Sequence, residues 1–401
     1  MSESLRNLLA GLTTALFAVN LIHSFMYLPA ADRHEGGEHM PHGVYYACLF
    51  AFYFAMMFAL FAPSLPLMWV AVELTTLVSA PLIAYRRTKE SLEAMWKYLL
   101  ICSIGIGLAL FGTMLVLHAQ TTGNLAWHKV GFAFILAGYG TKTGLAPFHT
   151  WLPDAHSEAP APVSAILSGA LLNCSFFAIV RFCDIMPEEA VPFCRGAMLA
   201  LGLLSLLVAA VFMVRQTDYK RLLAYSSVEH MGLATVMLAV LLGSEWEAEP
   251  GDGSIFMVIA FFAHIAFHSL TKTMLFLCAG NLLLAFGTRA IAAVQGLGST
   301  MRGHAFLWTV GILFICGVPP SVLFFTELAF VVAAPAWVSS VALALLFIVF
   351  AAMTRVALGM SMGRPAAHPS EIQLRLAVMP VLVFLALLFG GLCASAVAAY
   401  L

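Results

Sequence analysis

Long apolar segments recur along the whole 401-residue chain, and they limit its possible folds more than any other feature. A run of about 18 or more apolar residues can span a hydrocarbon core of roughly 30 Å. Only 10% of the residues are charged and 62% are hydrophobic, whereas soluble domains usually carry about 25% charged residues. We therefore expect an all-α polytopic membrane protein.

About twelve transmembrane helices are expected, separated by polar or Gly/Pro-rich segments. The helix candidates are 8–28, 43–62, 66–86, 94–118, 129–149, 160–182, 195–214, 219–242, 255–286, 303–328, 334–360 and 375–400. The first lacks a basic n-region and a cleavage site before Pro29, so we interpret it as a retained helix. The segment 255–286 exceeds one straight span, so a kink, a tilt or a break is open there.

The Lys and Arg residues divide unequally between the two ends of these helices. One end would carry Arg33, Arg86, Arg87, Lys89, Lys97, Arg215, Lys220, Arg221, Arg289, Arg302, Arg355, Arg364 and Arg375, and the other only Arg6, Lys129, Arg181 and Arg195. The positive-inside rule makes the first end cytoplasmic and places both termini outside. We expect a multi-pass protein of the cell inner membrane with periplasmic termini.

Two segments carry proline within or near a span, at Pro147 and at Pro319–Pro320. Proline removes a backbone donor and clashes with the preceding turn, so both helices are expected to be broken or kinked. Each is the fourth helix in a set of five, and an odd number inverts the second set. This predicts two inverted five-helix repeats, 43–183 and 195–360, flanked by an N-terminal helix and loop (1–42) and a C-terminal helix (361–401).

Several ionisable residues lie inside these apolar segments. A charge near the bilayer centre costs roughly 2.5–3.5 kcal/mol on insertion scales, so each requires a structural or functional reason. The candidates for an ion pathway are Glu73, Lys142, Glu229, His230, His264, His268, Lys272 and Glu327.

Glu73 lies midway along one apolar segment, and Lys142 lies five residues before Pro147. Burial and pairing shift the proton affinities of such groups in opposite directions, so a pair that opens and closes acts as a proton switch. The alternative is a static ion pair that holds two helices together.

His264, His268 and Lys272 are spaced to share one helix face. Imidazoles titrate near neutral pH and can pass protons through water, so we interpret the three groups as a proton relay. A lone histidine would more often be a core residue. A metal site is disfavoured, because lysine is a poor ligand.

Glu229 and His230 follow the basic stretch DYKRLLA and are expected nearer the cytoplasmic surface, in an interfacial or a conducting role. Asp218, Lys220 and Arg221 are interpreted as a solvated helix end. Glu327 follows the double proline and is placed towards the outer half of its span.

The eight cysteines stand singly, without a CxxC motif or a Cys/His cluster. We therefore expect no cofactor, no metal site and no iron–sulfur cluster within the chain. Any redox centres would lie in other subunits.

Three strings of the sequence resemble a known family: GYGTKTGLAPFHTWLPDAHSEAPAPVSAILSGALLN from Gly138, DYKRLLAYSSVEHMG from Asp218, and HSLTKTMLFLCAG from His268. They are similar to the antiporter-like membrane subunits of respiratory complex I, multisubunit Na⁺/H⁺ antiporters and energy-converting [NiFe] hydrogenases. The resemblance covers about residues 40–360 and implies a half-channel of Glu73 and Lys142, a central link of His264, His268 and Lys272, and an exit at Glu327.

Two features depart from this family pattern. Asn173 stands where relatives commonly carry a lysine or histidine, and asparagine cannot hold a proton. Together with SSVEHMG, it resembles the component F type of hydrogenase-4. About two N-terminal helices and the long lateral C-terminal helix of the relatives are expected to be missing.

The sequence thus predicts a proton-translocating subunit of a redox-driven complex, hydrogenase-like or complex I-like. The alternatives are a Na⁺/H⁺ antiporter module, a non-conducting structural subunit and an inorganic-carbon or other anion uptake subunit. Expected partners are other membrane subunits, including sister antiporter-like subunits, the lipid bilayer, and protons or Na⁺. No nucleic-acid partner is expected.

Overall fold

The computed structural model describes residues 1–35, 38–242, 252–363 and 377–400. Its long helices are α1 (Ser2–Glu35), α2 (His42–Phe61), α3 (Leu65–Ile83), α4 (Lys89–Thr122), α5 (Leu125–Thr143), α8 (Leu172–Cys183), α9 (Val191–Val214), α10 (Tyr219–Leu241), α11 (Asp252–Phe286), α13 (Arg302–Ile315), α14 (Val322–Ala333), α15 (Ala336–Met362) and α16 (Val378–Tyr400). Shorter helical elements are α6 (Trp151–Glu158), α7 (Ala161–Ile166), the π-helix η1 (Leu167–Leu171), the 3₁₀ helices η2 (Glu188–Ala190) and η3 (Ile291–Ala293), and α12 (Leu297–Thr300). The described residues form no β-strand, which confirms the all-α prediction.

Nine helical segments of the described residues are long and apolar enough to cross a membrane, and three shorter apolar helices add to them. Each expected segment falls on helix, but several boundaries differ. The first helix is longer than expected because it continues through Pro29 to Glu35. The segment 255–286 is one unbroken helix, so the break considered there was wrong. Arg364 and Arg375 lie outside the described residues.

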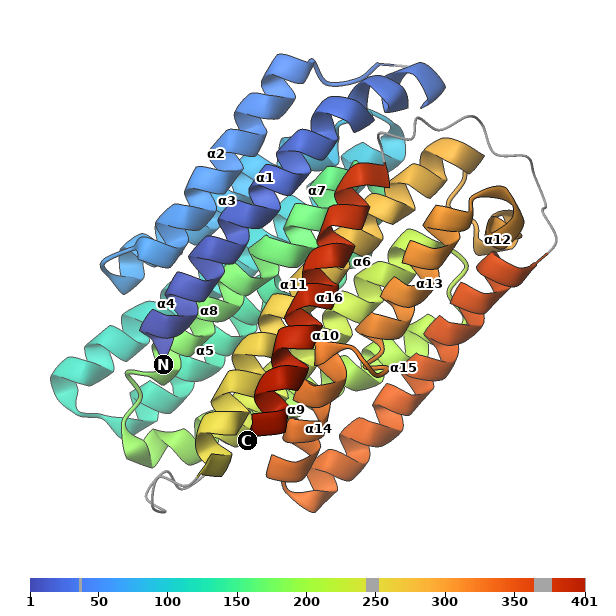
Figure 1. The fold of residues 1–401 in the computed structure, drawn as a ribbon. Coiled ribbons are helices and arrows are strands. Elements are labelled where there is room, and N and C mark those ends of the chain that lie inside the picture. The colour runs from blue at the N-terminus through green and yellow to red at the C-terminus, as the bar shows by residue number, and fades with distance from the viewer. Residues whose placement is uncertain (36–37, 243–251, 364–376, 401) are drawn as a thin grey trace.

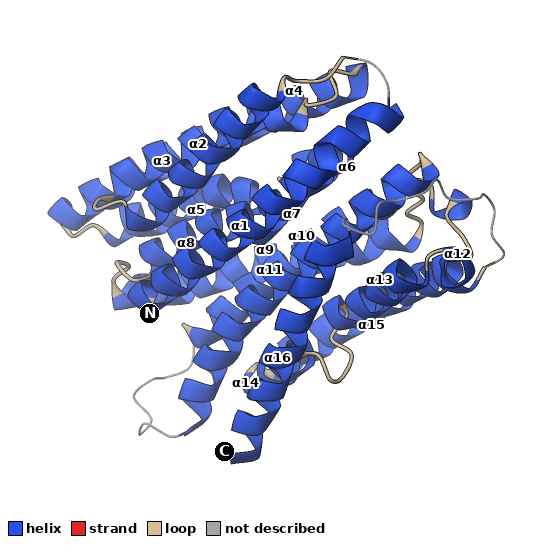
Figure 2. Cartoon of the chain, turned by 45° about the horizontal axis from the view of Figure 1, so that its top comes forward, coloured by secondary structure: helices blue, strands red, loops and turns tan. Residues whose placement is uncertain are grey.

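Helix α11 occupies the centre of the bundle and contacts α1, α7, α10, α13, α14 and α16. Helices α2–α5 lie on one flank of it, and α13–α15 lie on the opposite flank (Figure 1). Figure 2 shows α11 between the same two groups from another direction. Helix α1 begins and α16 ends at the same end of the bundle (Figure 1).

Small residues allow the closest helix contacts. A Cβ added at Gly138 of α5 would stand 2.6 Å from the Cβ of Ala109 on α4. On the other side of the bundle, a Cβ at Gly202 of α9 would stand 2.8 Å from the carbonyl oxygen of Gly232 on α10. Small residues at such crossings let the backbones approach, which is the usual packing mode of membrane helices.

Both predicted helix breaks are present, and they have the same local construction. Helix α5 ends where Gly144 adopts a φ of +86°, and α13 is followed by Gly317 with a φ of +64°. In each break a proline in a cis peptide bond stands three residues after the glycine, at Pro147 and Pro320. Glycine is favoured at these positions because other residues rarely adopt a positive φ. Helix α5, the first of the two broken helices, ends before the expected residue 149 because Gly144 terminates it.

Candidate functional site

Lys142 lies in the last turn of α5 and is completely buried. Its Nζ donates hydrogen bonds of 2.7 Å to the Thr76 hydroxyl on α3 and of 2.7 Å to the Tyr98 hydroxyl on α4. The Tyr98 hydroxyl also lies 2.7 Å from Ser79 Oγ. The ammonium group is therefore held by neutral hydroxyl groups rather than by a carboxylate.

Glu73 is half-buried on α3, and the described structure contains no direct ion pair between it and Lys142. Its Oε1 accepts a hydrogen bond of 2.9 Å from Ser103, and its Oε2 lies 3.4 Å from the Thr76 hydroxyl. Thr76 thus contacts both charged groups. The two groups predicted to pair are thus connected through one hydroxyl group and do not contact each other directly.

The relay residues on α11 all turn towards α10, as their spacing predicts. Lys272 Nζ donates to the Leu223 carbonyl oxygen at 2.6 Å and also to Ser226 Oγ. His264 Nε2 lies 3.3 Å from His230 Nδ1, and the His268 ring lies 5.0 Å from the His230 ring, centroid to centroid.

His230 lies at the centre of this cluster, within the protein interior. It is 1% exposed, and its Nε2 lies 2.8 Å from the carbonyl oxygen of Ile315, where α13 ends before the second break. Glu229 is 2% exposed, and its carboxylate lies 4.0 Å from His230. Both residues are more buried than expected for a solvated helix end, because other helices cover the segment of α10 that carries them.

Glu327 on α14 lies beside the second break. A Cβ added at Gly317 would come within 2.9 Å of the Glu327 carboxyl carbon, so this carboxyl group packs directly against the glycine. The neighbouring Thr326 hydroxyl lies 3.1 Å from His264 Nδ1. The break, Glu327 and the histidine cluster therefore adjoin one another.

Asn173 lies on α8 between the Lys142 region and α11. Its Nδ2 donates to Ser269 Oγ at 2.7 Å and to the Gly169 carbonyl oxygen at 2.9 Å, and its Oδ1 is buried without a hydrogen-bond partner in the described structure. Because Ser269 adjoins His268 in sequence, Asn173 contacts the polar region of α11. It supplies no group that changes its charge.

Lys220 differs most from its predicted environment. It was expected at a solvated helix end, but it is 1% exposed, and its Nζ donates to the carbonyl oxygens of Ser157 and Ala159 at 3.1 and 2.7 Å. These carbonyl groups stand at the end of α6 and come from a region about sixty residues earlier. The local sequence pattern could not indicate this partner of Lys220, because the contact joins residues that are far apart in the sequence.

A cluster of ion pairs surrounds α6 at one end of the bundle, here called the basic end. Asp154 accepts from Lys97 at 3.1 Å and from Arg221 at 2.7 Å. Arg289 lies 2.6 Å from Glu158 and 3.6 Å from Asp218. These cations belong to the set that was predicted to share one side of the membrane.

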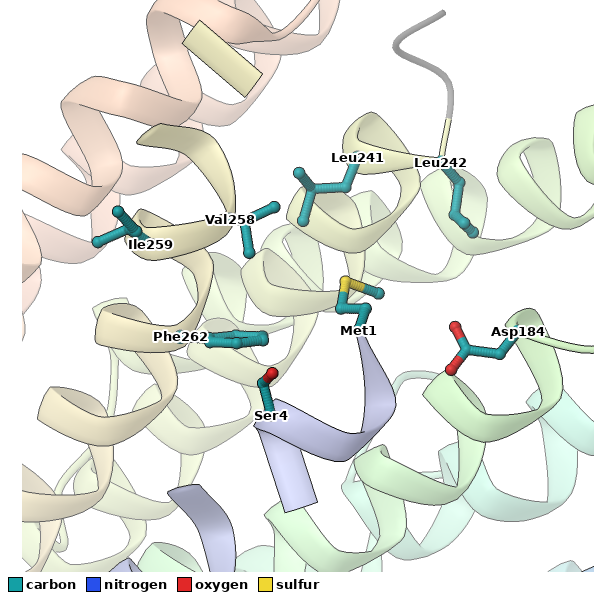
Figure 3. Close-up of a pocket in the computed structure, with 8 residues that line it drawn as sticks. All are labelled: Met1, Ser4, Asp184, Leu241, Leu242, Val258, Ile259 and Phe262. Atoms are coloured by element: carbon teal, nitrogen blue, oxygen red, sulfur yellow. The ribbon is translucent and has the colours of Figure 1, made fainter. Parts of the chain in front are cut away.

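One pocket lies away from these polar residues, at the end of the bundle where α1 begins (Figure 3). It has a volume of about 490 Å³, and its lining is mainly apolar, including Leu241, Val258 and Phe262, with Ser4 and Asp184 as polar members. None of the predicted pathway residues lines it. Among the described residues, no group of His, Cys, Asp and Glu has a geometry that could hold a metal ion.

The fold and the buried ionisable groups define a polytopic helical membrane protein with two broken helices beside a polar interior. Residues 62–354 match the family described as the transmembrane region of NADH:quinone oxidoreductase and Mrp antiporter proteins. The chain belongs to this family.

Individual relatives agree with this assignment. The chain is 38% identical over 340 residues to a hydrogenase-4 component F homolog of Methylacidiphilum infernorum, covering 79% of this chain and 67% of the relative. It is 30% identical over 270 residues to hydrogenase-4 component B of Escherichia coli, covering 64% of this chain and 40% of that protein. The chain thus spans about two thirds of the first relative and two fifths of the second.

Solved structures share the fold at lower sequence identity. A chain in the Mrp complex from Dietzia sp. superposes with a TM-score of 0.80 at 18% identity, covering 97% of this chain and 81% of that one. A chain of respiratory complex I from Thermus thermophilus superposes with a TM-score of 0.79 at 20% identity, covering 96% and 80%. The arrangement of helices is therefore that of an antiporter-like membrane subunit.

Proposed function

We propose that this chain is a proton-translocating subunit of a multisubunit redox-driven membrane complex, hydrogenase-like or complex I-like. The observation that carries the proposal is the completely buried ammonium group of Lys142, which is bound by neutral hydroxyls and linked to Glu73 through Thr76. A cation without a direct counter-ion in a bilayer is costly, and intramembrane ionisable groups usually mark ion pathways.

In the proposed mechanism, charge movement in a neighbouring subunit perturbs the Glu73 carboxylate. The hydrogen bond through Thr76 changes, and Lys142 releases or takes up a proton. The proton then moves through water past Asn173 to Lys272. From there it passes through the histidine cluster of His230, His264 and His268 to the exit at Glu327. Division into inverted repeats at 43–183 and 195–360 is part of this proposal, because each repeat contributes one helix break.

The proposed orientation places the basic end in the cytoplasm and both termini in the periplasm, in the cell inner membrane. The clustering of Lys97, Arg221 and Arg289 around α6 supports it, because cationic loops stay on the cytoplasmic side. Partners would be other membrane subunits, with redox centres in those subunits.

A specific observation favours a second candidate, a non-conducting structural subunit. Asn173 holds its position by hydrogen bonds to Ser269 and Gly169, and it cannot carry a proton. A subunit of this kind would hold its neighbours in place without translocating ions itself.

Redox-driven acidification of vesicles that contain the intact complex tests the proposal. We expect Lys142→Ala to assemble and to reduce acidification, and we expect replacement of Na⁺ by K⁺ to leave wild-type acidification unchanged. Full acidification by assembled Lys142→Ala would contradict conduction through this subunit. A strict requirement for Na⁺ would instead favour the Na⁺/H⁺ antiporter alternative.

A further inference from the structure

His156 is an ionisable residue that the pathway above does not use. It lies on α6 and is completely buried, and both of its ring nitrogens lack a hydrogen-bond partner in the described structure. Its ring stacks on Phe276 of α11, with the centroids 4.8 Å apart. A buried imidazole normally has at least one partner, so a polar group outside this chain, most simply water, is expected beside it.

Two buried lysines flank this imidazole. Lys272 of the relay and Lys220 of α10 are the charged groups that act on the His156 ring. Lys272 is one helical turn before Phe276, on which the ring is stacked. His156 therefore adjoins the segment of α11 that carries Lys272, and its neighbour Ser157 binds Lys220.

The side chains around α6 form a gradient of exposure from the basic end inward. Arg289 and Asp218 at the surface have side chains that are 27% and 19% exposed. Behind them, Lys220 is 1% exposed, and His156 and Lys272 are both fully buried. Ser157 connects the surface to the interior, because its hydroxyl donates to Asp218 at 3.0 Å and its carbonyl oxygen accepts from Lys220.

The backbone of α6 is held firmly in this position. Ser164 Oγ donates to the His156 carbonyl oxygen at 2.9 Å, and Arg289 donates to the Ser157 carbonyl oxygen at 2.7 Å. The imidazole is thus presented to the interior by a fixed helix. Its free nitrogens do not result from a poorly packed segment.

We propose that His156 is the entry residue through which protons from the basic end reach Lys272. This inference rests on the proposed function and adds its site of uptake. One ring nitrogen accepts a proton delivered by water from the surface cluster, and the other releases its proton towards Lys272, so the ring ends neutral with its tautomer reversed.

The two lysines determine when this proton transfer can occur. A proton on His156 is repelled by both ammonium groups. The ring can therefore be loaded only when Lys272 has passed its own proton to the relay. The charged groups that act on His156 are Lys220 on α10 and Lys272 on α11. The carboxylates of its own helix, Asp154 and Glu158, are two residues away on either side and pair instead with Lys97, Arg221 and Arg289.

The test compares His156→Gln with Lys142→Ala and with His118→Gln in vesicles of the intact complex. His118 is an exposed histidine of α4 and serves as the matched control. Acidification per electron transferred is measured while the pH on the basic-end side is varied. We expect His156→Gln to reduce acidification by about ten-fold or more. As the pH on the basic-end side is raised, acidification by this variant should begin to decline at a lower pH than in wild type, because proton uptake then depends directly on proton concentration. His118→Gln should match wild type.

Three results would overturn the inference. The first is full acidification by His156→Gln. The second is a loss of acidification in His156→Gln that is equal at every pH, which indicates a packing role, and the third is failure of both His156→Gln and the smaller His156→Asn to assemble. If Lys142→Ala retains full acidification, the proposed function fails as well. If Lys142→Ala is impaired and His156→Gln is not, only the entry role is rejected.

Discussion

The Lys142 ammonium group does not touch the Glu73 carboxylate, and the two are joined by the hydroxyl group of Thr76. Lys142 Nζ donates to Thr76 Oγ1 at 2.7 Å, and the same oxygen lies 3.4 Å from Glu73 Oε2. A neutral hydroxyl between two ionisable groups can exchange its hydrogen-bond direction when either group changes its charge. Glu73, Thr76 and Lys142 therefore form one hydrogen-bonded triad, which is the proton switch of the proposed pathway.

Thr76→Val tests the triad, because it keeps the side-chain shape and removes the hydroxyl. We expect redox-driven acidification to fall by about ten-fold or more, with normal assembly of the complex. Thr75→Val is the matched control, since the Thr75 hydroxyl is also buried but donates only to the Val72 carbonyl oxygen of its own helix. Equal activity of the two variants would show that Thr76 is dispensable.

His230→Gln tests the centre of the histidine cluster. The change removes the group that adjoins both His264 and His268 and contacts Ile315 beside the second break. We expect acidification to be lost while electron transfer continues. His128→Gln is the control, because His128 lies in the first turn of α5 and contacts the Asn124 carbonyl oxygen. An active His230→Gln complex would exclude this histidine from the pathway.

Gly317→Ala and Gly287→Ala separate backbone strain from contact with Glu327. The two glycines have nearly the same φ, +64° and +65°. A Cβ at Gly287 would meet open space, whereas one at Gly317 would press on the Glu327 carboxyl group. Thermal unfolding should show that Gly287→Ala lowers the free energy of unfolding by about 1 kcal/mol. Gly317→Ala should lower it further, and only this variant should also reduce acidification. Identical behaviour would mean that Glu327 can move away freely.

Asp154→Asn tests the ion pairs around α6. The change weakens contacts to Lys97 on α4 and to Arg221 on α10, two helices that both pack against α6. These side chains are partly exposed, so we expect the free energy of unfolding to fall by about 1 kcal/mol, and we expect this difference to become smaller at high salt. Glu93→Gln should have a smaller effect, because Glu93 pairs with Lys97 alone. Thermal unfolding at low and high salt measures both, and a salt-independent loss would point to packing instead.

The sequence predicted the elements of this fold and the principal ionisable residues, because apolar segments make a buried charge conspicuous. Lys142 stood out for this reason, and Pro147 and Pro319–Pro320 marked the two breaks. Thr76, Tyr98 and Ser226 could not be selected in the same way. Threonine, tyrosine and serine are unremarkable in a helix, and their importance comes from contacts between different helices.

Lys220 and His156 show the opposite limit. The stretch DYKRLLA has the pattern of a solvated helix end, and only the arrival of α6 from about sixty residues earlier buries Lys220. His156 sits in a polar segment that looked like a loop, yet α6 is a buried helix within it. Local patterns report hydrophobic periodicity, whereas these environments are created by long-range packing.

The number of protons translocated per electron tests the central claim most directly. It is measured in vesicles that contain the intact complex with wild-type chain or with Lys142→Ala, at matched rates of electron transfer. If this subunit conducts protons through its buried residues, the ratio falls in the Lys142→Ala complex while electron transfer continues. An unchanged ratio in a fully assembled Lys142→Ala complex would contradict the account.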